Sequence, residues 1–167
     1  VNRNMPTVGG KKISLNQIDY IVPFDSPVYT IGQSEADERT LKIAGYVAEL
    51  VEDGSTIQLG IGALPDAIAR NLRDKKHLGV HSETLTESMK DLVECGAVDN
   101  SMKTINPGVC IGAQAAGSEE FYRFLDHNPM FAVYPVDYVN DPYVVGQNYK
   151  QVSINACIEM DLKGEAN

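Results

Sequence analysis

The sequence predicts an α/β fold, an open and mainly parallel sheet flanked by helices. Short apolar runs, typical of buried strands, alternate along the chain with segments of helical periodicity. Residues 55–82 read as a strand–helix–strand unit, and the two strands of such a unit lie parallel. The chain has 167 residues, 43% of them hydrophobic and 22% charged, which is enough for one domain with its own core.

Prolines and glycines punctuate residues 1–33, which are therefore expected to form an extended segment with a linker. The clearest helix follows: Ser34 is its expected N-cap, acidic residues fill its first turn, and Gly54 ends it. The elements expected after it are strand 55–60, helix 64–73, strand 78–82, helix 84–95, strand 109–114, helix 118–127, strand 130–134, a loop over 137–149, and strand 150–162.

Three of these expectations depend on local signals. Helix 84–95 closes at Gly96, a common residue just past a helix end. Residues 137–149 are rich in Tyr, Asn, Asp and Pro, which indicates a loop. Residues 150–162 alternate in a strand-like manner. Their apolar face would consist of Val152, Ile154, Ala156, Ile158 and Met160.

Composition excludes some classes of partner. The formal net charge of −9, from 23 acidic and 14 basic residues, argues against nucleic acid, which needs a basic footprint. No window approaches the apolar length of a membrane span, and the N-terminal residues lack the layout of a signal peptide. The cysteines and histidines show no metal-type spacing, so no metal site is predicted. Cys95, Cys110 and Cys157 are expected to be buried thiols of a cytoplasmic protein.

Two strand ends could carry chemistry. Gly60-Ile61-Gly62 lies between a strand and a helix, so its backbone amides can approach a ligand closely; the alternative is a tight turn without a ligand. Glu83 follows a buried strand, where it could be a general base, a metal ligand or a nucleophile; the alternative is a glutamate in solvent or at a helix cap. Because the two strands are expected to be parallel neighbours, both ends should meet at one sheet edge. There, amide donors could stabilise the oxyanion that forms when a carboxylate attacks a thioester.

Two further segments are weaker candidates. Glu159 is the rival carboxylate, but its alternation phase sets it opposite the apolar face of its strand, which favours a solvent-facing position. Asn140-Asp141-Pro142 is interpreted as a loop, with contact to substrate as the alternative.

Motifs along the whole chain resemble the acetyl-CoA hydrolase/transferase family, and most closely its 4-hydroxybutyrate and butyrate:acetate CoA-transferase branch. The most specific of these motifs are Gln58-Leu59-Gly60-Ile61-Gly62 and His81-Ser82-Glu83. The segments that carry the resemblance are Val1–Pro6, Ile18-Asp19, Glu52–Ala67, Lys75–Glu83, Asn128-Pro129, Pro135–Asn140 and Ile154–Cys157.

The resemblance implies a CoA-transferase that moves CoA between an acyl-CoA and a short-chain carboxylate through a glutamyl-CoA thioester. It assigns the nucleophile to Glu83 and implies that Gln58, Gly60 and Gly62 line the active site. His81 and Asn140, which lie in segments that carry the resemblance, are added as candidates for substrate or CoA binding. Coenzyme A would be a substrate, with no permanently bound cofactor. The expected partners are acyl-CoA, short-chain carboxylates and a second copy of the intact protein as a homo-oligomer, a dimer.

The resemblance also implies that this chain is a central fragment. Residues 1–33 would be the end of a first α/β domain plus a linker, and residues 34–167 the first half of the second, glutamate-bearing domain. Such a fragment is expected to be inactive alone. The family commonly continues its His-Ser-Glu motif with Met-x-Ser-Asp-Gly, whereas Thr84, Thr86, Glu87 and Ser88 stand here, which leaves the acyl group open.

Two other functions remain open at this point. Water attacking the Glu83 thioester would make the protein an acyl-CoA hydrolase, a difference that depends on water exclusion. A non-catalytic ligand-binding or assembly domain is the alternative from another class.

Overall fold

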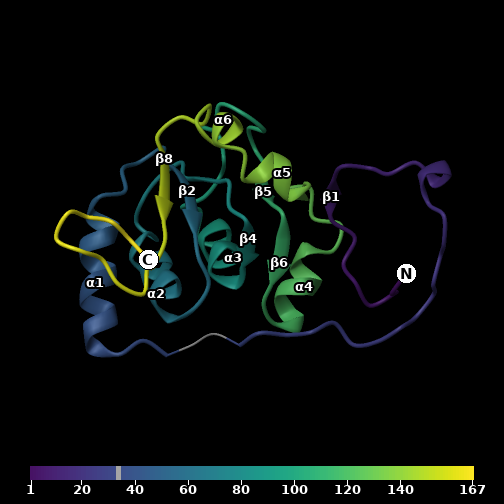
Figure 1. The fold of residues 1–167 in the computed structure, drawn as a ribbon, viewed down its shortest axis with the longest axis horizontal. Helices are drawn as coiled ribbons and strands as arrows, with labels where there is room; N and C mark the ends of the chain where they lie inside the picture. The colour runs from purple at the N-terminus through teal and green to yellow at the C-terminus, as the bar shows by residue number, and fades with distance from the viewer. Residues whose placement is uncertain (33–34) are drawn as a thin grey trace.

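The computed structural model describes residues 1–32 and 35–167, and its strands confirm the predicted open parallel sheet (Figure 1). A parallel bridge between His81 and Ile111 joins two three-stranded pieces, which gives the strand order β8-β2-β3-β5-β7-β1. Strands β4 and β6 form a separate parallel pair. The strands are β1 (Gly9–Gly10), β2 (Thr56–Leu59), β3 (Gly79–Val80), β4 (Thr84–Thr86), β5 (Cys110–Gly112), β6 (Gln114–Ala116), β7 (Phe131–Val133) and β8 (Gln151–Ile154).

Helices flank this sheet. The longer helices α1 to α4 pack each against the next, whereas the short helices α5 and α6 lie toward the top of Figure 1. The helices are α1 (Glu38–Glu49), α2 (Ala63–Asn71), α3 (Glu87–Glu94), α4 (Glu119–Leu125), α5 (Val136–Val139) and α6 (Pro142–Val145), with a 3-10 turn, η1, at Leu15–Gln17.

The predicted strand–helix–strand unit is confirmed. Strands β2 and β3 are parallel neighbours, with Thr56 opposite Gly79 and Ile57 opposite Val80. Helix α2 joins them and begins after Gly62, whose φ of 110° is one that L side chains rarely adopt. The alternate residues of β2 and the inner face of α2 are fully buried in one core, which fixes which strand ends emerge together.

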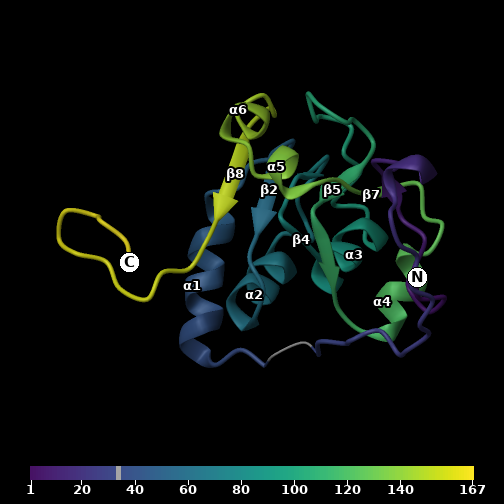
Figure 2. The same cartoon turned by 45° about the vertical axis from the view of Figure 1, so that its right-hand side comes forward.

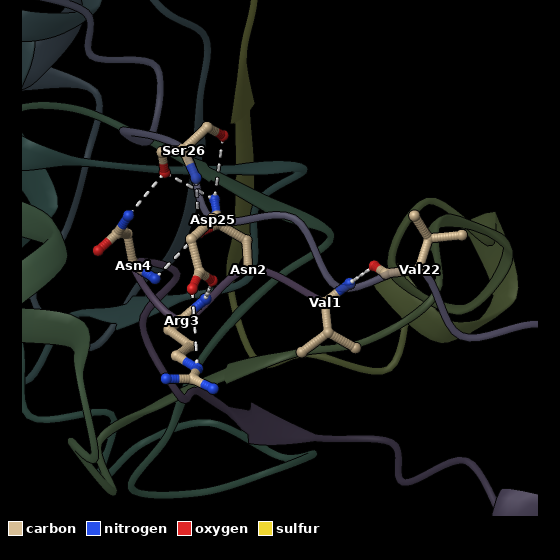
Figure 3. A network of polar contacts seen from close by, with 7 residues as sticks. All are labelled: Val1, Asn2, Arg3, Asn4, Val22, Asp25 and Ser26. Carbon is tan, nitrogen blue, oxygen red and sulfur yellow. Dashed lines mark hydrogen bonds and ion pairs between the residues drawn. The ribbon is translucent and has the colours of Figure 1, made fainter.

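The N-terminal segment packs against the far edge of the sheet. Strand β1 pairs with β7 in parallel, and Thr7 accepts a hydrogen bond from the amide of His127 at 2.8 Å. Figure 3 shows how the first residues are tied to residues 22–26: the Arg3 amide donates to Asp25 Oδ1 at 2.8 Å, and Asn2 Nδ2 donates to the Ser26 carbonyl at 2.9 Å. Residues 1–10 are therefore tied to the sheet edge and to residues 22–26.

Within the described residues, the N-cap of the first helix is not the expected Ser34. Asp37 is the N-cap of α1, and its side chain accepts a hydrogen bond from the amide of Thr40 at 2.8 Å. The Ser34 cap that the sequence predicts lies outside the described residues.

Two predicted boundaries were wrong in the middle of the chain. Thr84–Thr86 belongs to strand β4 rather than to the following helix, which begins at Glu87; two β-branched threonines pair well in a strand, and β6 supplies the partner. Residues 137–149 are not simply a loop, because α5 covers 136–139 and α6 covers 142–145. Asp141 caps α6 and Pro142 begins it, a start signal that the local composition concealed.

The last predicted strand is too long. Strand β8 pairs with β2 only from Gln151 to Ile154, because β2 ends at Leu59 and the turn at Gly60 offers no further partner. The residues beyond, Glu159 among them, are exposed, as predicted for that carboxylate. In Figure 2 this C-terminal tail extends away from the body of the molecule.

The predicted burial of the cysteines holds for one of them. Cys110 in β5 is buried, whereas Cys95 and Cys157 are exposed. Cys95 lies at the C-cap of α3 and Cys157 in the C-terminal tail, so neither falls on an inward face. Among the described helices, none combines the length and apolarity that crossing a bilayer requires.

Candidate active site

Several of the predicted site residues line one cavity of about 360 Å³ at the carboxyl ends of β2, β3 and β8. Strand β8 lies on the opposite side of β2 from β3, so the strand order reverses here, and ligands of open α/β sheets bind at such reversals. The cavity is lined by Gln58, His81, Glu83, Val139, Asn140, Pro142, Val145, Gln151, Ser153 and Asn155.

Glu83 is an exposed carboxylate on a well-anchored backbone. Its carbonyl oxygen accepts hydrogen bonds from the amides of Ala113 at 2.8 Å and Gln114 at 3.1 Å. Its side-chain Oε2 accepts one from Asn140 Nδ2 at 2.8 Å, and within residues 1–32 and 35–167 Oε1 has no protein donor. The carboxylate therefore has one oriented oxygen and one that is open to the cavity.

The two residues before Glu83 are buried and fix the strand end. The His81 amide donates to the Ile57 carbonyl at 3.1 Å, and the Ser82 hydroxyl donates to the Leu59 carbonyl at 3.1 Å. His81 Nε2 lies 2.8 Å from the carbonyl oxygen of Val139, the last residue of α5. Burial lowers the pKa of His81, and the positive charge of Lys103 lowers it further, although the Val139 contact acts in the opposite direction.

A buried lysine lies beneath this strand end. Lys103 is 4% exposed, and its ammonium donates hydrogen bonds to the carbonyls of Val80 at 2.9 Å and Val109 at 2.6 Å. Val80 is the last residue of β3, and Val109 is the residue before β5. Burial lowers the pKa of Lys103 to about 8. Burial also raises the pKa of its neighbour Cys110 to about 11, so that thiol is protonated near neutral pH. The sequence analysis did not identify Lys103, and no local motif marks it.

One wall of the cavity consists of amides and a hydroxyl. Gln58 Nε2 donates to Asn155 Oδ1 at 3.0 Å, which links β2 to the residue after β8. Gln151 and Ser153 lie on the same polar face of β8. The alternation of β8 already contained this signal, but from it only Glu159, on the face opposite Val152 and Ile154, was considered, and a solvent-facing position was expected for it.

The two predicted glycines lie beside the cavity rather than in its lining. Gly60 follows β2 and Gly62 precedes α2, so both emerge at the same sheet edge as Glu83, as the strand pairing predicts. Neither glycine is among the residues that line the cavity. Of the six predicted site residues, Gln58, His81, Glu83 and Asn140 are therefore brought together, and Gly60 and Gly62 flank them.

A larger cavity of about 870 Å³ lies between the N-terminal segment and α4. Two ion pairs lie within its lining, Arg123 with Glu119 at 3.6 Å and His127 with Asp126 at 3.9 Å, and Arg3 pairs with Asp25 just outside it. The Asp126 carboxylate there is also oriented, by the Thr7 amide at 2.7 Å, but it follows helix α4 rather than a strand end. The smaller cavity is therefore the better candidate.

The geometry at Glu83 suits nucleophilic chemistry on a carbonyl. An anchored carboxylate with one open oxygen can attack, and an amide N–H beside it can stabilise the oxyanion that a later attack on the glutamyl carbonyl would create. Glu83 is the acidic residue in a lining that contains no lysine or arginine.

Comparisons with known proteins find similar sequences among CoA-transferases. A family model described as acetyl-CoA hydrolase/transferase C-terminal domain matches residues 117–167. A 4-hydroxybutyrate coenzyme A transferase of Clostridium kluyveri is 42% identical over 99% of this chain and 39% of its own length. A succinyl-CoA:cyclohexane-1-carboxylate CoA transferase of Geobacter metallireducens is 40% identical over 99% of this chain and 38% of its own length.

A solved structure has the same fold. The crystal structure of a 4-hydroxybutyrate CoA-transferase from Porphyromonas gingivalis superposes with a TM-score of 0.93 and 39% identity, covering 99% of this chain and 42% of that one. The chain thus spans about two fifths of the length of the relatives it matches.

Proposed function

Since the chain belongs to the acetyl-CoA hydrolase/transferase family, we propose that it supplies the nucleophile-bearing part of a CoA-transferase. The reaction would move CoA from an acyl-CoA to a short-chain carboxylate, with Glu83 as the nucleophile. The observation that carries the proposal is the Glu83 carboxylate itself: its backbone is anchored, Asn140 orients its Oε2, and it faces a cavity at a strand-order reversal.

The chemistry proceeds in two halves. An oxygen of Glu83 attacks the thioester carbonyl of the donor, and the C–S bond breaks to give an acyl-glutamyl anhydride and CoA thiolate. The thiolate then attacks the glutamyl carbonyl, which forms a glutamyl-CoA thioester and releases the donor's acid as a carboxylate. An acceptor carboxylate takes over the CoA by the reverse steps. No net proton or electron is exchanged.

Asn140 would contribute in both halves. Before attack, its hydrogen bond to Oε2 restricts the rotation of the carboxylate and leaves Oε1 available. When thiolate attacks the glutamyl carbonyl, negative charge develops on an oxygen of residue 83, and the same amide donor can stabilise it. The hydrogen bond from Asn140 would therefore orient Glu83 in the ground state and stabilise the transition state more strongly than the ground state.

The rest of the reaction centre is proposed to come from a longer protein. Residues 34–167 would be the first half of its second domain, and residues 1–33 the end of its first domain with a linker. The matched relatives are more than twice as long as the stretch they share with this chain, which supports the longer protein. The 167-residue chain alone is accordingly expected to show negligible turnover.

The test is a matched pair of variants in the longer protein that carries these residues. With acetyl-CoA as donor and butyrate as acceptor, Glu83→Gln should lower butyryl-CoA formation by several orders of magnitude, because the amide keeps the shape and removes the nucleophile. The control is Glu159→Gln, which should retain wild-type rates, because Glu159 is exposed and does not line the cavity.

Omitting the acceptor distinguishes the two reactions of this family. Without butyrate, a transferase stops at the glutamyl-CoA thioester after releasing about one equivalent of acetate and little free CoA, whereas a hydrolase releases both continuously. Wild-type turnover by Glu83→Gln would contradict the assignment of the nucleophile in either case.

A further inference from the structure

We propose that His81 is a positioning residue that holds Asn140, and through it the Glu83 carboxylate, by a hydrogen bond to the last residue of α5. The proposal rests on the function proposed for Glu83. Two contacts form the connection: His81 Nε2 to the Val139 carbonyl at 2.8 Å, and Asn140 Nδ2 to Glu83 Oε2 at 2.8 Å. Since residues 81 and 83 belong to one strand end, the two contacts close a loop.

The His81 end of this loop is rigid. His81 is 1% exposed. Its backbone is hydrogen-bonded to Ile57 on one side and forms a β-bridge with Ile111 on the other. A carbonyl oxygen only accepts hydrogen bonds, so the hydrogen must be on Nε2. The donor is thus fixed in both position and tautomer.

The α5 end depends on outside support. Helix α5 spans only Val136–Val139, and a single helical turn is not stable through its own hydrogen bonds. The neighbouring Tyr138 hydroxyl donates to Asn106 Oδ1 at 2.9 Å, and the His81 ring holds the Val139 carbonyl. Asn140 is the next residue, so the position of its amide depends on this turn staying formed.

Direct substrate binding, for which His81 was a candidate on sequence, is less compatible with the ring's chemistry. Its Nε2–H is already used by Val139. In the neutral ring Nδ1 can only accept, and it has no partner among the described residues. The reacting groups of the proposed substrates, a thioester carbonyl and a carboxylate, are acceptors too. A neutral His81 therefore has no donor to offer them.

The surroundings keep the ring neutral. The titratable groups near His81 are the Lys103 ammonium, the Cys110 thiol in β5, the Tyr138 phenol on α5 and the Glu83 carboxylate at the same strand end. Burial and the charge of Lys103 both disfavour a second cation here, which lowers the pKa of His81. A fixed neutral donor suits a positioning role rather than proton transfer.

The test is a double-mutant cycle on kcat in the longer protein. His81→Asn retains an amide but is too short to reach the Val139 carbonyl, and Asn140→Ala removes the donor to Glu83. Each single variant should lower kcat by about tenfold to a hundredfold with KM nearly unchanged, because a small misplacement of a reacting group has effects of this size. The double variant should be no worse than the poorer single variant within about threefold, because both changes break one connection.

The matched rescue variant is His81→Gln, whose side-chain nitrogen is the same number of bonds from Cβ as Nε2 of histidine. It should recover most of kcat. Multiplicative losses in the double variant, or equal losses for His81→Gln and His81→Asn, would show that His81 acts independently of Asn140 and would overturn the proposal.

Crystal structures of His81→Asn and His81→Gln supply a readout that needs no turnover. The Asn140–Glu83 contact should be lost in the first variant and kept in the second; a retained contact in His81→Asn would overturn the proposal. If wild-type protein shows no transfer dependent on Glu83, the proposed function fails, while the two structures still decide the role of His81.

Discussion

Glu83 and Glu159 are both carboxylates that follow a strand, and both accept a hydrogen bond from an asparagine amide, yet their surroundings differ. Asn140 donates to Glu83 at 2.8 Å, and Asn167 donates to Glu159 at 3.2 Å. Glu83 lies between the buried residues Ser82 and Thr84. Glu159 lies between Ile158 and Met160, whose exposed fractions are 93% and 62%.

The difference comes from what each strand end is attached to. The backbone of Glu83 is held by the strand pair β4–β6 and lies above the buried Lys103. Strand β8 loses its partner after Ile154, so the backbone around Glu159 is tied mainly to its own tail, through Asn167. An amide–carboxylate contact indicates a site only where the fold already holds both partners in place.

The largest expected effect after loss of Glu83 itself comes from its amide partner. In the longer protein, Asn140→Ala should lower kcat by about tenfold to a hundredfold, since the carboxylate loses its orientation and the later oxyanion its donor. Asn167→Ala removes the corresponding partner of Glu159 and should leave kcat within about twofold. Steady-state kinetics of both variants sharpen the comparison, and equal losses would break it.

A second effect concerns the support beneath Glu83. The folded pKa of Lys103, about 8, lies below its ordinary value of 10.5, so the unfolded chain binds the proton more tightly between these values. The contribution of Lys103 to the free energy of unfolding is fully present above its ordinary pKa and is lost as the pH falls to about 8. Cys110 has the opposite effect above its ordinary pKa of 9.0: its folded pKa is raised to about 11, so its contribution to the free energy of unfolding falls as the pH rises.

The window in which Lys103 dominates is therefore about pH 8 to 9. There the free energy of unfolding of the chain should rise with a slope of up to about 1.4 kcal/mol per pH unit. Denaturant titrations at several pH values measure this slope, which Lys103→Met should abolish. Equal slopes for the wild-type chain and Lys103→Met would mean that folding does not lower the pKa of Lys103.

The smallest effect is expected in the C-terminal tail. Ile158→Ser should change the free energy of unfolding by no more than about 0.5 kcal/mol, as for other exposed positions, because that side chain has almost no contact to lose. Urea titration of the chain provides the measurement. A loss above about 1 kcal/mol would show that the tail packs against the body and that Glu159 is better supported than its exposure indicates.

Much of the sheet and part of the site followed from local patterns. The apolar runs 55–60 and 78–82, separated by a helical segment, predicted parallel neighbours and thereby placed Gly60 and Glu83 at one sheet edge. Asn140 was a weaker candidate, because its segment was interpreted as a loop with contact to substrate as the alternative; the structure places it against Glu83. These predictions succeeded because strand burial and chain crossover are determined by nearby residues.

The remainder depended on contacts distant in sequence. Strand β8 stops at Ile154 because its partner β2 ends, although the alternation of its own residues continues. Lys103 became a support for β3 and β5 only through folding, and its sequence neighbours contain no sign of its burial. The polar face of β8 lines the cavity because α5 and α6 cover it, and neither helix was predicted.

The most direct test of the central claim is to map the covalent intermediate in the longer protein. Incubation with acyl-CoA and no acceptor should accumulate a glutamyl-CoA thioester, which hydroxylamine converts to a hydroxamate with release of CoA. Peptide mass mapping should then locate the hydroxamate on Glu83 and find Glu159 unmodified. A hydroxamate on Glu159, or on neither residue in a preparation with full transferase turnover, would contradict the account.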